Sequence, residues 1–397
     1  MNSILSPLIN ELAEQLQNEN EQTLHQFLDE MKTNETPLIE ICPMNEGYRL
    51  ITYLWLGDEE TENVYVCGSY PGWDLTSNKL EKLLHTNLWY KTFRTNEQFV
   101  STYYFSVNDY FEHDWVKRSK HYQLDQFNSK TFGTNPDKAS FLELGTAIQY
   151  DKTYFQNHIP HGEIETYSFY SSALGNARKL IIYTPRDYSR TSTPQDLVIT
   201  FDGSSFMQNL SAAITLDNLI YKKEIPSCIV VGMDHVDRFA ELTYNDKMNS
   251  FLKDELLPWI QTKYHVQKDP THITIAGLSL GGLAAFYAAL QYPHVFGNVL
   301  SLSGSVHRKK DGYEDTIPWI EQKFLTSSSK YPFHTYMAAG ALENKSLLEA
   351  NRSLYKTLKE NEYQITYLEF SGGHDEIWWR ELFAEGLLAL YHSKKIV

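Results

Sequence analysis

The period of the hydrophobic positions changes twice along the chain. Between Leu8 and Met31 apolar residues recur every three or four positions, which predicts an amphipathic N-terminal helix. From Tyr48 to Asn108, short runs rich in Tyr, Trp, Val and Phe alternate with polar turns such as SYPGWD. This pattern is typical of an all-β sandwich, and we expect most of its aromatic side chains to form the sandwich core.

Beyond residue 150 the pattern is different. Apolar runs such as DLVITF, SCIVVG, HITIA and NVLSLS alternate with helix-forming stretches such as LAAFYAALQY and SLLEANRSLYKTLKE. Alternating strands and helices predict a mostly parallel sheet covered on both faces. The predicted fold class is therefore α/β, with an α/β-hydrolase domain over residues 151–397. An N-terminal helix and an immunoglobulin-like β-sandwich precede it over residues 1–150.

The segment GLSLGG, residues 277–282, lies between the strand-like run ITIA and a helix-forming run. It fits the pattern G-x-S-x-G, in which a tight strand-to-helix turn exposes a serine above the sheet. Glycines on both sides avoid side-chain collisions in that turn, and the helix N-terminus favours developing negative charge. We predict that Ser279 is a nucleophile and that the backbone N–H of Leu280 binds an oxyanion. The alternative is a purely structural turn.

A nucleophilic serine needs a base and an acid, which in this fold follow it in the order acid, then histidine. His374 stands in SGGHDEIWW, directly after the run QITYLEF, and is the predicted base. Glu343 follows the run HTYMAA in a loop and is the predicted acid. Asp375, which adjoins the histidine, and Asp311, in a long loop, stay open as alternatives.

Two further loops follow predicted strands. After DLVITF the sequence reads DGSSF, so the amide of Gly203 or Ser204 is the expected second oxyanion donor. After SCIVVG comes MDHVDRFAEL, which places Arg238 at a carboxyl strand end, where α/β sheets bind ligands. Arg238 either contacts a ligand or pairs with Glu241 or Asp237.

Composition narrows the function class. The net charge of −15 argues against nucleic acid or an anionic membrane as a partner. The three cysteines are far apart and have no metal-site spacing, so we expect buried thiols. Hydrolysis by a serine nucleophile needs neither a metal nor an organic cofactor, and we expect none. Because the N-terminus lacks a basic-then-apolar leader and no apolar run approaches a membrane span, the expected location is cytoplasmic.

Five segments together resemble the enterochelin (enterobactin) esterase family of the esterase D-like α/β-hydrolases. They are FDGSSF, DRFAEL, GLSLGGLAAFYAALQYPHVFGNVLSLSGS, AAGALENKSLLEANRSLYKTL and GGHDEIWWR. The resemblance implies Ser279 as nucleophile, His374 as base and Glu343 as acid. It also implies substrate contacts by Arg238 and by Phe206, which stands where members of the family often have Trp.

The resemblance implies a serine esterase that hydrolyses the ester bonds of a catecholate siderophore trilactone, with the ferric complex as the expected partner. Residues 1–150 would then wall one side of the substrate cleft. Arg238 and the basic run at 308–310 are the candidate contacts for the anionic ligand. The alternatives are a general carboxylesterase or acyltransferase on the same fold and a non-catalytic ligand-binding protein.

Overall fold

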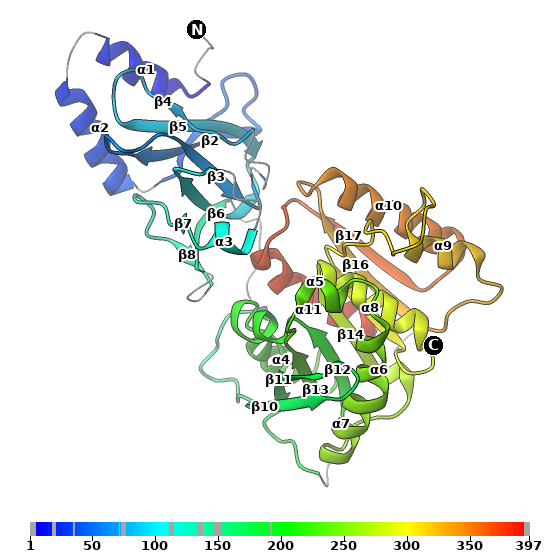
Figure 1. Cartoon of the computed structure of the whole chain (residues 1–397). Helices are drawn as coiled ribbons and strands as arrows, with labels where there is room; N and C mark the ends of the chain where they lie inside the picture. Colours follow the sequence, from blue (N-terminus) through cyan, green and yellow to red (C-terminus); the bar gives the residue numbers. More distant parts are fainter. Residues whose placement is uncertain are drawn as a thin grey trace. The chain divides into compact units, whose positions relative to one another are not determined.

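The computed structural model describes residues 5–17, 21–34, 36–70, 72, 77–110, 115–133, 138–145, 152–190 and 193–392. The chain forms two compact units (Figure 1). One comprises residues 1–148 together with Ser371–Ile377, and the other comprises residues 149–370 and 378–397. A single division near residue 150 therefore does not describe the chain, because the segment Ser371–Ile377 groups with the first unit.

In its described residues, the first unit contains three helices and two antiparallel sheets. Its helices are α1 (Pro7–Leu16), α2 (Glu21–Asn34) and the short α3 (Trp115–Ser119). One sheet has the order β1-β2-β5-β4, and the other has the order β3-β6-β9-β8 with β7 paired to β6. The strands are β1 (Leu38–Ile41), β2 (Tyr48–Leu56), β3 (Val64–Gly68), β4 (Glu81–Lys82), β5 (Leu88–Asn96), β6 (Phe99–Val107), β7 (Tyr122–Gln123), β8 (Thr131–Phe132) and β9 (Ala139–Leu144).

Many aromatic residues of the sandwich are buried in its core, as the alternation predicted. Tyr53, Trp55, Tyr103 and Phe105 pack in one buried cluster contributed by both sheets. Leu54, on the opposite face of β2, packs with residues of α1 and α2. Because β2 is covered on both faces, it is buried along most of its length, and the N-terminal helices belong to the same unit.

The second unit is built on an eight-stranded sheet with the order β10-β11-β13-β12-β14-β15-β16-β17. Pairing is antiparallel from β10 to β13 and parallel from β13 to β17, which confirms the mostly parallel sheet. The strands are β10 (Glu163–Ser171), β11 (Asn176–Thr184), β12 (Asp196–Phe201), β13 (Cys228–Met233), β14 (Ile273–Leu278), β15 (Asn298–Leu302), β16 (His334–Gly340) and β17 (Ile365–Phe370).

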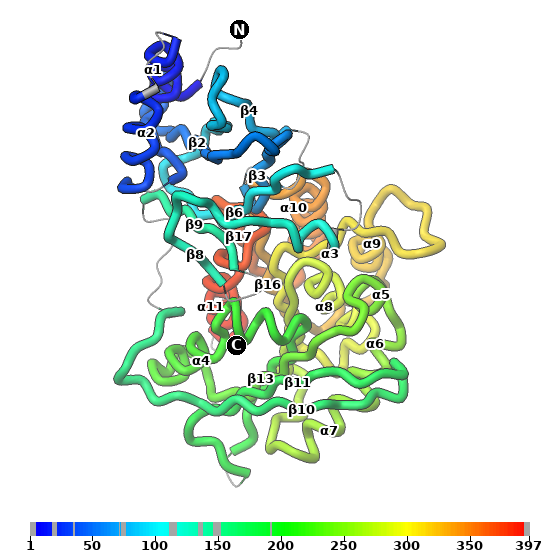
Figure 2. Tube along the Cα trace, turned by 60° about the vertical axis from the view of Figure 1, so that its left-hand side comes forward, coloured from blue at the N-terminus to red at the C-terminus, as the bar shows by residue number. Residues whose placement is uncertain are grey.

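Helices cover both faces of this sheet (Figures 1 and 2). One core cluster joins alternate strand residues to side chains of the helices from α6 to α10. On the other face, Gly386 in the last helix approaches Leu300 and Tyr336. The helices are α4 (Ala212–Tyr221), α5 (Arg238–Leu242), α6 (Asp246–Ser250), α7 (Leu257–Lys263), α8 (Leu280–Gln291), α9 (Trp319–Thr326), α10 (Lys345–Glu360) and α11 (Glu376–His392), with π-helical turns at Ser205–Asn209 and Phe251–Leu256.

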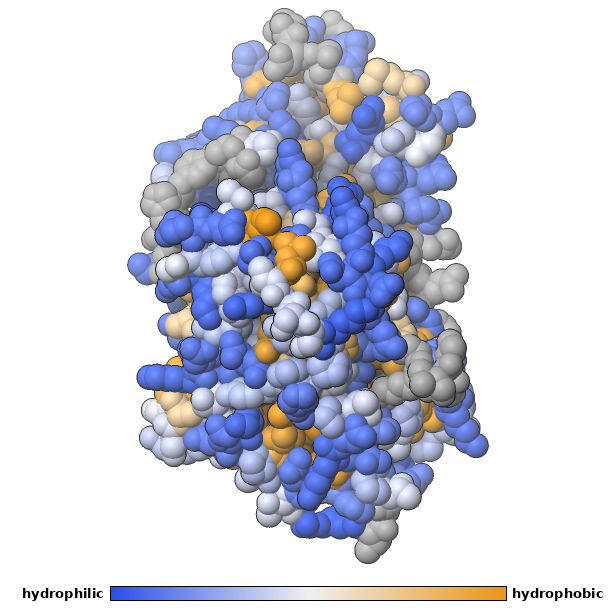
Figure 3. Space-filling view, turned by 90° about the vertical axis from the view of Figure 1, so that its right-hand side faces the viewer, coloured by the Kyte–Doolittle hydropathy of each residue, from blue (hydrophilic) through white to orange (hydrophobic). Residues whose placement is uncertain are grey.

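In the described part of the chain, no helix is both long and apolar enough to cross a membrane. On the face drawn in Figure 3, hydrophobic side chains form small patches separated by hydrophilic ones. The large apolar clusters lie inside each unit, between the sheets of the sandwich and between the eight-stranded sheet and its helices.

Candidate active site

Ser279 lies in a strained turn between β14 and α8. Its φ is +54° and its ψ is −115°, a backbone conformation that a serine rarely adopts. The turn is held from both sides: the Ser279 amide donates to the carbonyl of Leu302 at 2.9 Å, and its carbonyl accepts from the amides of Gly282, Leu283 and Ser305. Strain of this kind persists only where the surroundings fix it, and it is typical of functional sites. The structure therefore supports the predicted nucleophile turn.

The first glycine of the motif, Gly277, is required by a close backbone contact. A Cβ atom at this position would lie 2.1 Å from the backbone carbon of Gly281, so no side chain fits there. The strand and the start of α8 can approach so closely because residue 277 has no side chain. This contact bends the chain sharply and leaves Ser279 at the carboxyl end of the sheet.

Two serines that follow β15 extend the site. The Oγ atoms of Ser279 and Ser305 lie 3.3 Å apart. The hydroxyl of Ser303 donates to Oε1 of Glu343 and accepts from the indole N–H of Trp379 at 2.8 Å. Neither Ser303 nor Ser305 was singled out from the sequence, although both belong to the SGS that follows the strand.

Glu343 is a buried carboxylate at the same edge of the sheet. Besides the Ser303 hydroxyl, its Oε1 accepts the amide of Gly340 at 2.9 Å. Because β14, β15 and β16 are neighbouring parallel strands, Glu343 and Ser279 both follow their carboxyl ends. The two donors fix the orientation of the carboxylate. This agrees with an orienting role for Glu343, which stays a prediction.

His374 lies in the segment Ser371–Ile377, which belongs to the first unit. The residue after it, Asp375, is almost fully buried, and its Oδ2 accepts from the Ser69 hydroxyl at 2.6 Å. The same oxygen accepts from the amide and the hydroxyl of Thr102 at 2.7 and 3.0 Å. These donors commit Asp375 to the β-sandwich, which argues against it as the acid of a triad. The third carboxylate considered, Asp311, is exposed.

The three predicted oxyanion donors have different surroundings in the structure. Leu280 is the first residue of α8, where a backbone N–H has no partner within the helix. Gly203 lies against β13 so closely that a Cβ would meet the Gly232 carbon at 2.5 Å. The Ser204 amide instead donates to Oδ1 of Asp234 at 2.7 Å. The prediction for Ser204 is therefore wrong in this conformation, because its N–H is already bonded to a carboxylate.

Arg238, at the start of α5, is bound to Asp202. Its Nε and Nη2 donate to the two carboxylate oxygens at 2.7 and 2.8 Å, and Nη2 also donates to the carbonyl of Leu278 at 3.2 Å. Burial alone raises the pKa of Asp202, but the hydrogen bonds and charges of Arg238 and His235 outweigh it and hold the pKa below its usual value. Neither Glu241 nor Asp237, the partners considered from the sequence, makes this pair.

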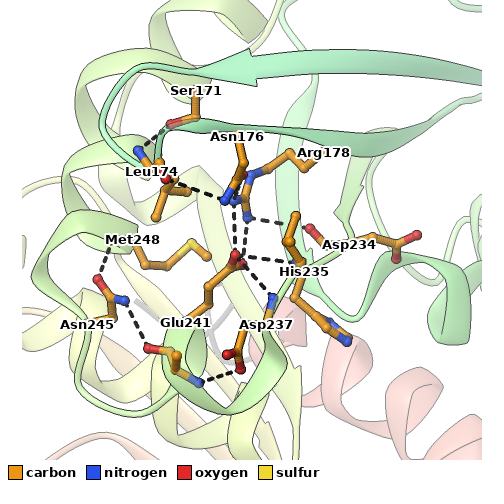
Figure 4. Close-up of polar contacts among 12 residues, drawn as sticks. Ser171, Leu174, Asn176, Arg178, Asp234, His235, Asp237, Glu241, Asn245 and Met248 are labelled. Carbon is orange, nitrogen blue, oxygen red and sulfur yellow. Dashed lines mark hydrogen bonds and ion pairs between the residues drawn. The ribbon is translucent and has the colours of Figure 1, made fainter.

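Glu241 has a different partner, Arg178 of β11. The two side chains form a buried ion pair at 2.9 and 3.3 Å (Figure 4). The Arg178 guanidinium also lies 4.9 Å from the centre of the Phe251 ring. Oε1 of Glu241 also accepts the amides of Val236 and Asp237. The pair therefore anchors α5 to the sheet. Arg178 was missed because nothing in the run ARKLIIYT distinguishes a buried arginine from a surface one.

Phe206 is not available to a substrate. Its side chain is fully buried, and its ring packs edge-on against that of Phe383 in α11, with the centres 5.2 Å apart. The expected substrate contact is therefore wrong. The residue follows a strand end in the sequence, but the π-helical turn Ser205–Asn209 directs its side chain into the core.

Comparisons with known proteins agree with this geometry. The family model described as "Putative esterase" matches residues 171–390, more than half of the chain. The iron(III) enterobactin esterase of Escherichia coli O6:H1 is 30% identical over 224 residues, which are 56% of this chain and 55% of that protein. The iron(III) salmochelin esterase of the same organism is 26% identical over 225 residues, 54% of each chain.

The chain thus spans about half the length of the curated relatives it matches. Among solved structures, an enterobactin esterase from Shigella flexneri, crystallised in the presence of enterobactin, superimposes with a TM-score of 0.73. It covers 91% of this chain and 97% of its own, at 24% identity, which supports the α/β-hydrolase fold with its N-terminal sandwich. The family model covers more than half of the chain, and the chain therefore belongs to the esterase family.

Proposed function

We propose that this esterase hydrolyses the lactone ester bonds of a catecholate siderophore of the enterobactin or bacillibactin type, presented as the ferric complex. The observation that supports it best is the strained Ser279 turn, in a chain whose relatives include iron(III) enterobactin and iron(III) salmochelin esterases. Cleavage of the trilactone would separate the catechol arms, which would lose the effective concentration that makes iron binding tight.

In the proposed mechanism, Ser279 Oγ attacks a lactone carbonyl while His374 accepts the hydroxyl proton. The amides of Leu280 and Gly203 stabilise the oxyanion. His374 then protonates the leaving alkoxide, and water hydrolyses the acyl-enzyme by the same route. Glu343 orients the histidine and stabilises its charged form. In this scheme Arg238 acts on the nucleophile turn through Asp202 and Leu278, and any ligand contact is additional.

Replacing Ser279 with Ala tests the proposal. Loss of the nucleophile should reduce hydrolysis of a ferric trilactone by about four to six powers of ten, because nucleophile and base act as a unit. Product formation is measured by chromatography. A fluorophosphonate should label wild-type Ser279 and leave the Ser279→Ala protein unlabelled, as mass spectrometry of the peptides would report.

The outcomes separate the candidate functions. Labelling of Ser279 together with hydrolysis of simple esters, but no turnover of any catecholate trilactone, would favour a general carboxylesterase. Absence of labelling in the folded wild-type protein would favour a non-catalytic binder. Trilactone hydrolysis by Ser279→Ala within tenfold of wild type would contradict the mechanism itself.

A further inference from the structure

Arg308 and Phe239 meet beside the nucleophile turn, within the second unit. The guanidinium carbon of Arg308 lies 5.3 Å from the centre of the Phe239 ring. Phe239 is 55% exposed, and the Arg308 side chain is also exposed. The pair therefore presents an aromatic face and a cation to solvent at one place.

Both residues lie close in the fold to groups that contact Ser279. The amide of Arg308 donates at 3.0 Å to the carbonyl of Ser305, whose hydroxyl lies 3.3 Å from that of Ser279. Phe239 follows Arg238, whose guanidinium binds the carbonyl of Leu278, the residue before the nucleophile. A ligand on this pair would lie at the edge of the reacting site.

The backbone that holds Arg308 is fixed. The Arg308 carbonyl accepts the Tyr244 hydroxyl at 3.0 Å. Two residues further along, the Lys310 ammonium lies among three aromatic rings. It is 4.5 Å from the ring centres of Tyr287 and Trp319, and the third ring is that of Tyr244. It also donates to the Tyr287 hydroxyl at 2.8 Å. These contacts hold the loop, so Arg308 is presented from a defined position.

The helix that holds Phe239 is fixed as well. The buried pair of Glu241 with Arg178 anchors one end of α5 (Figure 4). The bidentate pair of Arg238 with Asp202 anchors the other end. Asp237 caps the helix by accepting the Ala240 amide at 3.0 Å. A site built from fixed elements loses little conformational entropy when a ligand binds.

The surroundings of the charge distinguish Arg308 from Arg238 and Lys310. Arg238 is neutralised by Asp202, and Lys310 is enclosed by its aromatic rings. Among the residues that the structure describes, the Arg308 guanidinium forms no ion pair and no hydrogen bond, and its only recorded side-chain contact is with Phe239. In a chain of net charge −15, such a cation next to a reactive serine favours an anionic ligand.

We propose that Arg308 and Phe239 form a subsite for an anionic aromatic group of the substrate. A guanidinium that stacks on a ring keeps its N–H groups in the plane, where they can donate to carboxylate or catecholate oxygens. The Phe239 ring adds an apolar surface for the aromatic part of the ligand. The subsite deepens the proposed function by assigning two residues to recognition of a catecholate arm.

The test uses the full-length protein and 2,3-dihydroxybenzoate as the probe, with dissociation constants measured by calorimetry. Arg308→Gln should raise the dissociation constant about tenfold or more, because it removes a charge-assisted hydrogen bond. Phe239→Leu should raise it about three- to tenfold. Lys309→Gln removes the same charge from the adjacent exposed residue and should change it less than twofold. Thermal unfolding checks that each variant is folded.

Equal weakening by Arg308→Gln and Lys309→Gln would overturn the subsite, since it would indicate only general electrostatic attraction. The absence of measurable binding to the wild-type protein at millimolar concentrations would also overturn it. Because the probe contains no ester, the result does not depend on trilactone hydrolysis. Wild-type binding that depends on Arg308, together with no trilactone turnover, would refute the proposed siderophore substrate and support the subsite.

Discussion

Asp202 and Arg238 explain how single side chains keep a strained serine in place. The Asp202 carboxylate lies 3.1 Å from where a Cβ of Gly281 would stand, and Arg238 binds both that carboxylate and the carbonyl of Leu278. The pair therefore touches the backbone on both sides of Ser279. A ligand contact by Arg238, expected from the family resemblance, stays a prediction. The geometry itself supports a positioning role.

Replacing Asp202 with Asn should lower the free energy of unfolding by about 2 kcal/mol at neutral pH, because Arg238 loses its charged partner. The pKa of Asp202 is lowered by folding, so the carboxylate stabilises the folded state above its unfolded pKa. The stability difference between wild type and Asp202→Asn should be constant above about pH 5 and shrink as the pH falls below the usual aspartate range of about 3.9.

Urea unfolding of both proteins between pH 3 and pH 7 measures this difference. A difference that grows as the pH falls would contradict the assignment of the pKa shift. A drop in activity toward neutral and anionic esters alike would support the positioning role of the pair. A drop confined to anionic esters would instead favour a direct ligand contact by Arg238.

Two short segments, α5 and residues 371–377, contain Arg238 and His374. Each is attached by a buried carboxylate: Glu241 binds Arg178, and Asp375 binds Ser69 and Thr102. Gly373 lies so close to the sandwich that a Cβ there would meet the Ser69 carbonyl oxygen at 2.2 Å. Neither segment is long enough to keep its shape without these anchors.

Replacing Asp375 with Asn should reduce kcat about ten- to a hundredfold for every ester, since displacement of the neighbouring His374 by about an ångström suffices for such a loss. The amide replaces an oxygen that accepts three hydrogen bonds, so the melting temperature should also fall. The surface change Glu362→Gln is the matched control and should affect neither quantity.

The pH dependence of kcat identifies the role of Asp375. If Asp375 is only an anchor, Asp375→Asn should lower kcat and leave unchanged the apparent pKa on the acidic side of the pH profile. If Asp375 were instead the acid of the triad, its replacement would shift that pKa, because the charge next to the imidazolium would be lost. Unchanged kcat in Asp375→Asn would contradict both roles.

At the scale of the whole chain, the sequence passes between the two units more than once. The segment Ser371–Ile377 returns to the first unit between β17 and α11 of the second. The sandwich residues are therefore expected to matter for any ester, because they bind the segment that contains His374. A role of residues 1–150 as a cleft wall, expected from the sequence, is a separate proposal.

A chain that starts at residue 149 should lose hydrolysis of p-nitrophenyl acetate as well as of a trilactone. The reason is that Asp375 and Gly373 would lose their partners Ser69 and Thr102. Circular dichroism must first establish that the truncated chain is folded. If the folded truncation hydrolyses the neutral ester at the wild-type rate and fails only on the trilactone, the cleft wall would be supported and the anchoring role rejected.

The sequence by itself determined the architecture and the turn that holds Ser279. Hydrophobic periodicity is set locally by the geometry of strands and helices, so it predicted the sandwich, the mostly parallel sheet and the strand–turn–helix at Ser279. The glycines around Ser279 were informative for a similar reason, since the tight turn that they permit involves only residues 277–282. The order of segments along the chain sufficed to identify the esterase fold.

Only the tertiary structure decided which side chains meet. Phe206 and Arg238 both follow strand ends, yet one side chain lies in the core and the other binds Asp202, 36 residues away. Asp375 and Ser69 are 306 residues apart, and Arg178 and Glu241 are 63 apart. Such pairs leave no periodic trace, because a carboxylate finds its partner through the packing of distant elements and not through its neighbours in sequence.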